Sequence, residues 1–205
     1  MKKVTLIIMA ICSLTAYIVY SQTLKKTITI SEQKKYPKAL VDYNDFKILV
    51  KEAEKHRAER LISLDVFLKM CKEKNVVILD SRSDFRFNRK HLKGALHLDF
   101  TNYTQENLTK LIPDTKTKIL IYCNNNFKGD QIDFASKIAN PSNTTKETQI
   151  LANRKPVMLA LNIPTYINLY GYGYRNIYEL DELVNVNDKR IKFEGTEVIP
   201  TVFIK

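Results

Sequence analysis

The sequence predicts a single α/β domain in which helices flank a central parallel sheet. The unbroken apolar runs at 76–80 ("VVILD") and 118–123 ("KILIYC") are typical of strands that are buried on both faces of such a sheet. These runs alternate with segments of helical periodicity, and this alternation implies right-handed crossovers between parallel strands. With 205 residues, 44% of them hydrophobic, the chain can build one core.

The first 22 residues have the pattern of an export signal. Lys2 and Lys3 precede an uncharged apolar run from Val4 to Tyr20, which is at the short limit for crossing a bilayer core of about 30 Å. The short run favours cleavage, but bulky Tyr20 only half fits a cleavage site, so retention as an N-terminal anchor stays open. Either alternative predicts an exported protein, periplasmic or secreted, that meets a membrane only if the segment is retained.

Residues 23–60 form a predicted N-terminal extension. Its "TITI" alternation permits an edge strand, and the stretch "YNDFKILVKEAEKHRAERL" predicts an amphipathic helix. The predicted domain spans 61–184 and opens with a helix for which Ser63 is the N-cap. Cys71 lies on the apolar face of that helix, so we expect it to be a small core residue, although pairing with Cys123 stays open in an oxidising compartment.

The remaining elements follow in order. After the strand at 76–80 comes an alternating stretch, "GALHLDF", and the strand at 118–123 leads into a predicted helix at 130–139. Polar residues 140–155 are interpreted as an insertion or long loop. A helix bent or interrupted near Pro164 then precedes a strand from Arg175 to Leu180. Residues 185–205 form a C-terminal extension whose alternation around "EG" predicts a hairpin.

The net charge of +11 is spread along the chain. No block of five or six basic residues and no nucleic-acid-binding signature accompanies it. The composition therefore favours a solvated basic surface over a nucleic-acid partner. A single nearby histidine gives no ligand set for a metal, so we expect no metal site and no cofactor.

Asp80 and Cys123 both stand at the carboxyl ends of predicted strands, where ligands bind in open parallel sheets. Cys123 runs into the loop Asn124, Asn125, Asn126, Phe127, Lys128 and Gly129. Backbone amides of such a loop, with the positive end of a following helix, can stabilise a thiolate. Asparagines also tolerate the left-handed backbone that a cradle of amides uses.

Three segments in order resemble the rhodanese (sulfurtransferase) domain family. In "VVILDSRSDFRFNRKHLKGALHL" the matching residues are Asp80, Arg82, His91, Gly94 and Ala95, with Lys90 in place of the usual first glycine. "KILIYCNNNFKGD" resembles the strand and active-site loop, and "YGYRNIYEL" resembles a later turn and strand. The resemblance implies a rhodanese-like fold with Cys123 at the nucleophile position.

The resemblance implies a sulfurtransferase or persulfide carrier in which the Cys123 thiolate takes sulfur from thiosulfate, a persulfide or a protein persulfide partner. Asp80 and Arg82 are then expected to form an ion pair that braces the loop, and His91 to bond the backbone. The family usually places an arginine and a serine where this chain has Lys128 and Gly129.

Two features of the loop predict poor binding of small dianions. Lys128 lacks the fork of an arginine, and Asp130, as N-cap of the predicted helix, would repel an anion. The alternative is a noncatalytic rhodanese-like binding module of the cell envelope that uses the loop and residues 140–155. Phosphoryl transfer is disfavoured because the position six after Cys123 is Gly129, not arginine.

Overall fold

A computed structural model describes residues 36–140 and 156–198 of the chain. The chain divides into two compact units, Met1–Asp42 and Tyr43–Lys205, which are taken separately. In the first unit the described residues, 36–42, form no helix or strand. The predicted signal at 1–22, the "TITI" stretch and residues 141–155 lie outside the described residues.

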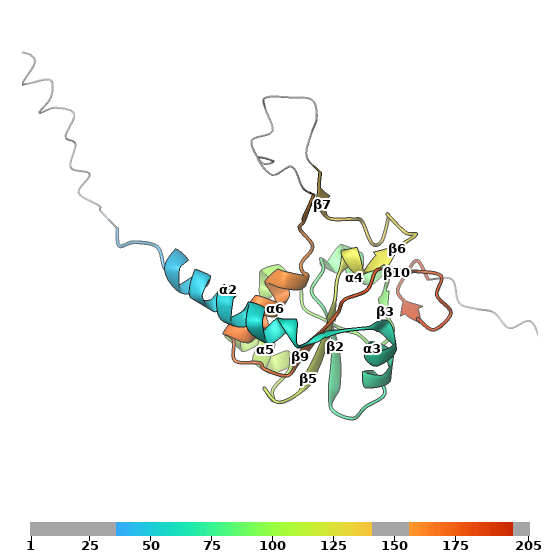
Figure 1. Cartoon of the computed structure of the whole chain (residues 1–205), viewed down its shortest axis with the longest axis horizontal. Helices are drawn as coiled ribbons and strands as arrows, with labels where there is room; N and C mark the ends of the chain where they lie inside the picture. Colours follow the sequence, from blue (N-terminus) through green and yellow to red (C-terminus); the bar gives the residue numbers. More distant parts are fainter. Residues whose placement is uncertain (1–35, 141–155, 199–205) are drawn as a thin grey trace, which may run out of the picture. The chain divides into compact units, whose positions relative to one another are not determined.

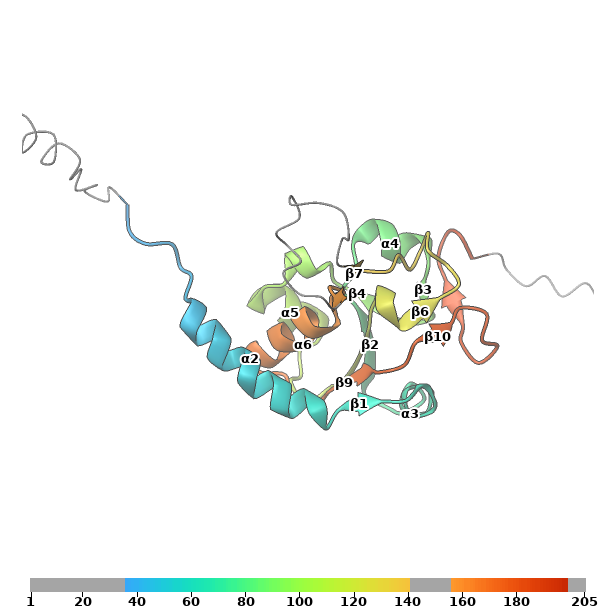
Figure 2. The ribbon, with the colours of Figure 1, turned by 45° about the horizontal axis from the view of Figure 1, so that its top comes forward.

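A five-stranded parallel sheet forms the centre of the second unit (Figure 1, Figure 2). Its strand order is β1-β9-β5-β2-β4. The strands are β1 (Leu61–Ile62), β9 (Ile177–Leu180), β5 (Lys118–Tyr122), β2 (Val76–Asp80) and β4 (Leu96–His97). All four neighbouring pairs are parallel, which confirms the predicted fold class.

The register of the sheet brings the ends of β2 and β5 together. Asp80, the last residue of β2, pairs with Tyr122, the last residue of β5, and Cys123 follows directly. Because carboxyl ends of parallel strands share one edge, the two strand ends that sequence analysis singled out form a common edge.

Helices cover both faces of the sheet. On one face α3 (Leu64–Met70) packs with the loop that follows β5, and on the other lie α5 (Gln105–Leu111) and α6 (Asn162–Gly171). Side chains of β5 alternate between the two cores: Leu120 and Tyr122 face α3, whereas Ile119 and Ile121 face α5 and α6. A strand buried on both faces is what its unbroken apolar run predicted.

Two predicted helices form near the N-terminus of the second unit. Helix α2 (Tyr43–Ala58) packs against α6 and β9: His56 Nδ1 lies 2.7 Å from the hydroxyl of Tyr166, and Arg57 pairs with buried Glu179. Helix α3 begins after Ser63, whose hydroxyl accepts a bond from the N–H of Val66, as the cap prediction required.

Three predictions about irregular regions are wrong. Residues 130–139 do not form a helix: one turn, closed by the Phe134 N–H on the Asp130 carbonyl, is followed by the two-residue strand β7 (Ile138–Ala139), which pairs with β8 (Val157–Met158). Pro164 does not bend a helix, because it lies in the first turn of α6, where its missing N–H has no intrahelical partner.

The third wrong prediction is the C-terminal hairpin, which does not form within the described residues 185–198. The strand β11 (Phe193–Glu194) pairs antiparallel with β3 (His91–Leu92), about a hundred residues earlier, rather than with a neighbour in its own tail. Another short strand, β10 (Val184–Asn185), pairs with β6 (Phe127–Lys128). The C-terminal part of the described chain therefore pairs with β6, which follows β5, and with β3.

Short helices connect the strands at the edge. Helix α4 (Asp84–Arg89) follows β2, and the 3-10 turns η1 (Phe100–Asn102) and η2 (Asn124–Asn126) follow β4 and β5.

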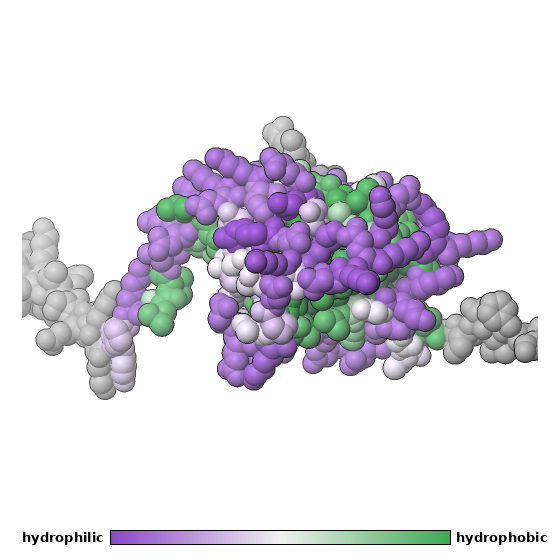
Figure 3. Space-filling model, turned by 90° about the horizontal axis from the view of Figure 1, so that it is seen from below, coloured by the Kyte–Doolittle hydropathy of each residue, from purple (hydrophilic) through white to green (hydrophobic). Residues whose placement is uncertain are grey.

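The face seen from below is mainly polar, with apolar side chains visible between the polar ones (Figure 3). No helix within residues 36–140 and 156–198 has the length and hydropathy to cross a membrane.

Candidate functional site

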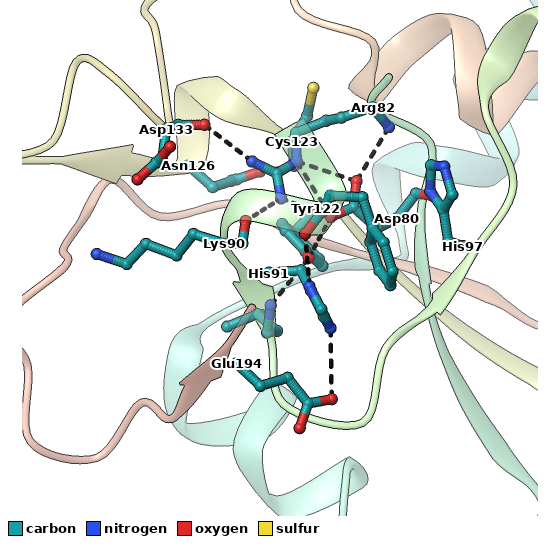
Figure 4. A network of polar contacts seen from close by, with 12 residues as sticks. Asp80, Arg82, Lys90, His91, His97, Tyr122, Cys123, Asn126, Asp133 and Glu194 are labelled. Atoms are coloured by element: carbon teal, nitrogen blue, oxygen red, sulfur yellow. Dashed lines mark hydrogen bonds and ion pairs between the residues drawn. The ribbon is translucent and has the colours of Figure 1, made fainter. Parts of the chain in front are cut away.

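Cys123 is the first residue after β5 and points away from the polar network beneath it (Figure 4). Its side chain is buried, with 3% of the residue exposed. The N–H of Leu161, at the start of α6, donates to Sγ at 3.3 Å, and the N–H of Asn124 also contacts the sulfur. The thiol therefore lies against the N-terminus of α6, 38 residues further along the chain.

The surroundings of Cys123 favour the neutral thiol. Burial raises the pKa of Cys123, and the negative charge of Asp80 adds to this rise. The two N–H donors from Leu161 and Asn124, and the positive charge of Arg82, oppose the rise without cancelling it. At neutral pH most of the thiol is protonated, so the reactive thiolate is a minor form.

Alkylation of Cys123 should consequently keep accelerating with pH. Because the pKa is raised, the thiolate fraction grows roughly tenfold per pH unit up to and beyond the range where a free cysteine levels off. Iodoacetamide labelling, read on the Cys123 peptide by mass spectrometry between pH 6 and 10, measures this. A plateau below pH 8 would contradict the assignment.

The Cys123 thiol lines a cavity of about 360 Å³, called here the Cys123 cavity. The cavity is lined by Arg82, Ser83, Arg86, Cys123, Asn124, Lys137, Leu159 and Leu161. Three of these residues are basic and none is acidic. Arg86 and Lys137 form no ion pair within the described residues. The electrostatic character of the cavity suits an anion.

The three asparagines after Cys123 form a 3-10 turn instead of a left-handed cradle, which corrects the sequence prediction. Asn126 is buried, and its Oδ1 accepts the N–H of Cys123 at 2.9 Å while its Nδ2 donates to the carbonyl of Leu180 at 2.6 Å. Asn125 bonds both backbone groups of Lys137. Two of the asparagines therefore fix the loop, and neither lines the Cys123 cavity.

Asn124 is the asparagine that lines the cavity. It is 5% exposed, and its Oδ1 is buried with no hydrogen-bond partner in the described part of the chain. A buried amide oxygen left unpaired is costly, and a water molecule can supply the donor that it lacks. An anion without a hydrogen cannot, so this oxygen does not contribute to binding an anion.

The rest of the predicted loop, Phe127, Lys128 and Gly129, does not line the Cys123 cavity. Phe127 is buried in the core, where it packs against Phe134 and Phe193. Lys128 is exposed on β6 and does not line the cavity, so it is not the charge next to the thiol. Gly129 has φ +96°, a left-handed conformation that suits glycine and turns the chain away.

Asp80 and Arg82 form the ion pair that sequence analysis expected, beneath Cys123 (Figure 4). Arg82 donates from Nε and Nη2 to the Asp80 carboxylate, at 3.0 and 2.7 Å, and its remaining donors reach the carbonyls of Asp133 and Lys90. Burial opposes the charge of Arg82, but the hydrogen bonds and charge of Asp80 prevail, so the pKa of Arg82 is raised. The Tyr122 hydroxyl also donates to Asp80.

His91 and Asp130, the last two residues that sequence analysis singled out, lie outside the Cys123 cavity. His91 Nδ1 lies 2.6 Å from the Phe87 carbonyl, and Nε2 lies 3.4 Å from Glu194. Asp130 caps the single turn after the loop by accepting the N–H of Asp133, and its carboxylate pairs with Lys90 at 3.0 Å. Although burial acts to raise it, the bond from Asp133 and the charge of Lys90 lower the pKa of Asp130.

The position of Asp130 corrects the expected repulsion of anions. Its charge is balanced by Lys90, and it is absent from the cavity lining. Sequence analysis missed Arg86, Lys137 and Leu161, which the fold brings to the thiol. The four-residue spacing between Arg82 and Arg86 could have suggested Arg86 from the sequence. No sequence pattern pointed to Lys137 or Leu161. Irregular chain separates Lys137 from the loop, and the residues of the insertion lie between the loop and Leu161.

A family model agrees with this fold. The sequence model of the family described as "Rhodanese-like domain" matches residues 63–182, more than half of the chain. No curated protein matches the chain. A similar solved structure is the BH2092 protein from Bacillus halodurans, 14% identical, with a TM-score of 0.42 over 72% of this chain and 87% of that one. On the family match, the chain belongs to the rhodanese-like domain family.

Proposed function

We propose that the protein is a sulfurtransferase or persulfide carrier that accepts sulfane sulfur on Cys123 from a small anionic donor such as thiosulfate. The observation that carries the proposal is the Cys123 cavity, where the thiol meets a wall containing Arg82, Arg86 and Lys137 and no acidic residue. The apolar, uncharged run from Val4 to Tyr20 supports a setting outside the cytoplasm.

In the proposed reaction the Cys123 thiolate attacks the outer sulfur of thiosulfate. A new S–S bond forms at Sγ, the S–S bond of thiosulfate breaks, and sulfite leaves with the bonding electron pair. The terminal sulfur of the persulfide is then attacked by a nucleophilic acceptor, and the thiolate is released with its electron pair. Neither step needs an external oxidant.

The residues around the thiol have distinct parts in this reaction. Arg86 and Lys137 offer positive charge that binds the anionic donor. The N–H groups of Leu161 and Asn124 donate to Sγ and stabilise the negative charge of the thiolate. Arg82 is a positioning residue, because its fork is occupied by Asp80 and by backbone carbonyls.

Steady-state transfer of sulfur from thiosulfate to cyanide tests the proposal. Activity that disappears in Cys123→Ser and grows between pH 7 and 9 supports it, because the thiolate is the minor form at neutral pH. Absence of transfer from thiosulfate and from organic persulfides would favour the noncatalytic binding module instead.

The double variant Arg86→Ala/Lys137→Ala should raise the KM for thiosulfate. Arg86 is half-buried and Lys137 is exposed, so the loss of each charge weakens an ionic contact modestly and we expect a rise of about five- to tenfold with little change in kcat. Added salt should reduce the difference between the variant and the parent.

Lys128→Ala is the matched control for this double variant. It removes the same kind of charge from an exposed residue of the loop that does not line the cavity, so its KM should stay unchanged. A larger effect from Lys128 than from Arg86 and Lys137 would contradict the assignment of the anion site.

A further inference from the structure

A second cavity, of about 540 Å³, lies on the α3 face of the sheet and is called here the α3 cavity. It is bounded by α3, β2, β3 and residues 190–192, and it shares no lining residue with the Cys123 cavity. Its volume falls in the range of sites that hold small organic ligands. Nothing in the proposed sulfur chemistry uses it.

The α3 cavity exists because the helix over this part of the sheet is short. Strand β2 lies between β5 and β4, where a parallel strand is ordinarily covered on both faces. Helix α3 has seven residues, and Ile78 of β2 is left half-buried and lines the cavity. Its apolar floor consists of Phe67, Leu92 and Ile191, which are buried, and of Leu68, Cys71 and Ile78, which are half-buried.

The rim of the α3 cavity is basic. Lys72, Lys93, Arg190 and Lys192 line it, and no acidic residue does. Arg190 is already paired with Asp65 at 2.5 Å and Asp188 at 2.7 Å. The three lysines make no ion pair within the described residues, although the charge of Lys93 acts on Glu194 and helps to lower the pKa of that carboxyl.

We propose that the α3 cavity binds a long-chain carboxylate, a fatty acid, with its alkyl chain on the apolar floor and its carboxylate among Lys72, Lys93 and Lys192. The floor provides the surface that an alkyl chain needs to leave water. The lysines provide point charges that suit a single carboxylate and require no forked geometry. Binding needs both the alkyl chain and the carboxylate. Short anions and neutral apolar molecules have only one of the two, so they should bind more weakly than a fatty acid.

Cys71 on the cavity floor reports occupancy. Burial raises its pKa to about 11, so its alkylation is slow and is measured at alkaline pH. Dodecanoate, below its micelle concentration, should protect Cys71 of the full chain from N-ethylmaleimide, read on the Cys71 peptide by mass spectrometry. At a free concentration ten times the Kd the rate should fall about tenfold.

Two probes and a charge variant make the test specific. Butyrate, which lacks the chain, and dodecyltrimethylammonium, which has the opposite charge, should leave the Cys71 rate unchanged. Lys72→Glu/Lys192→Glu should weaken dodecanoate on the order of tenfold. Lys110→Glu/Lys116→Glu, the same charge change at exposed residues that do not line the cavity, should leave dodecanoate binding as it was.

The proposal fails if dodecanoate does not slow the alkylation of Cys71, or if dodecyltrimethylammonium protects Cys71 equally well. Protection that persists unchanged in Lys72→Glu/Lys192→Glu would also overturn it, because the carboxylate would then not contact the rim. Cys123→Ser should show the same protection, since the two cavities share no lining residue.

Discussion

Replacing Arg82 with alanine is expected to lower the free energy of unfolding by about 3–5 kcal/mol. Arg82 is 2% exposed and Asp80 is fully buried, so the variant would leave a carboxylate in the interior without its partner. It would also remove the donors that reach the carbonyls of Asp133 and Lys90. Urea denaturation monitored by circular dichroism measures the loss.

Two variants sharpen this result. Arg82→Lys should recover little of the lost free energy of unfolding. An ammonium cannot donate in the forked pattern to Asp80 while it also reaches two carbonyls. Arg86→Ala, four residues later on a partly exposed helix face, should change the stability by about 0.5 kcal/mol or less. If Arg82→Ala and Arg86→Ala proved equally stable, the network would not brace the loop.

Cys123→Ser should lower sulfur transfer at least roughly a thousandfold, because a serine hydroxyl cannot supply the nucleophile or hold the transferred sulfur. The fold should survive, since the serine hydroxyl can still accept the N–H of Leu161. Turnover of thiosulfate with cyanide as acceptor measures the loss.

Cys71→Ser is the control for this variant, because Cys71 lies at the end of α3 and does not line the Cys123 cavity. We expect it to keep the parental rate. Activity that survives in Cys123→Ser but disappears in Cys71→Ser would assign the chemistry to the other cysteine.

The strands were predictable because their pattern is local. The apolar runs at 76–80 and 118–123 form β2 and β5 as expected, and the ends of both strands lie at one edge. The helix at 130–139 was not predictable in the same way. Phe134 enters the core from an irregular segment while Ile132 and Ile138 are exposed, so tertiary packing overrides helical periodicity there.

Part of the geometry of the candidate site was predicted. Cys123 and the Asp80–Arg82 pair stand where the resemblance placed them, because they belong to the strand ends. The charges that line the cavity come from Arg86 and Lys137, not from Lys128, and the helix terminus at the thiol is that of α6. The position of α6 depends on where the chain returns after residues 141–155, and that of Lys137 on an irregular segment, and local sequence determines neither.

The intact mass of the full chain after incubation with thiosulfate and removal of excess reagent tests the central claim most directly. The claim predicts a gain of one sulfur atom, which dithiothreitol removes and which Cys123→Ser does not acquire. An unchanged mass at pH 9, where the thiolate is more abundant, would contradict a persulfide on Cys123. A sulfur adduct of the same size on Cys123→Ser would contradict it equally.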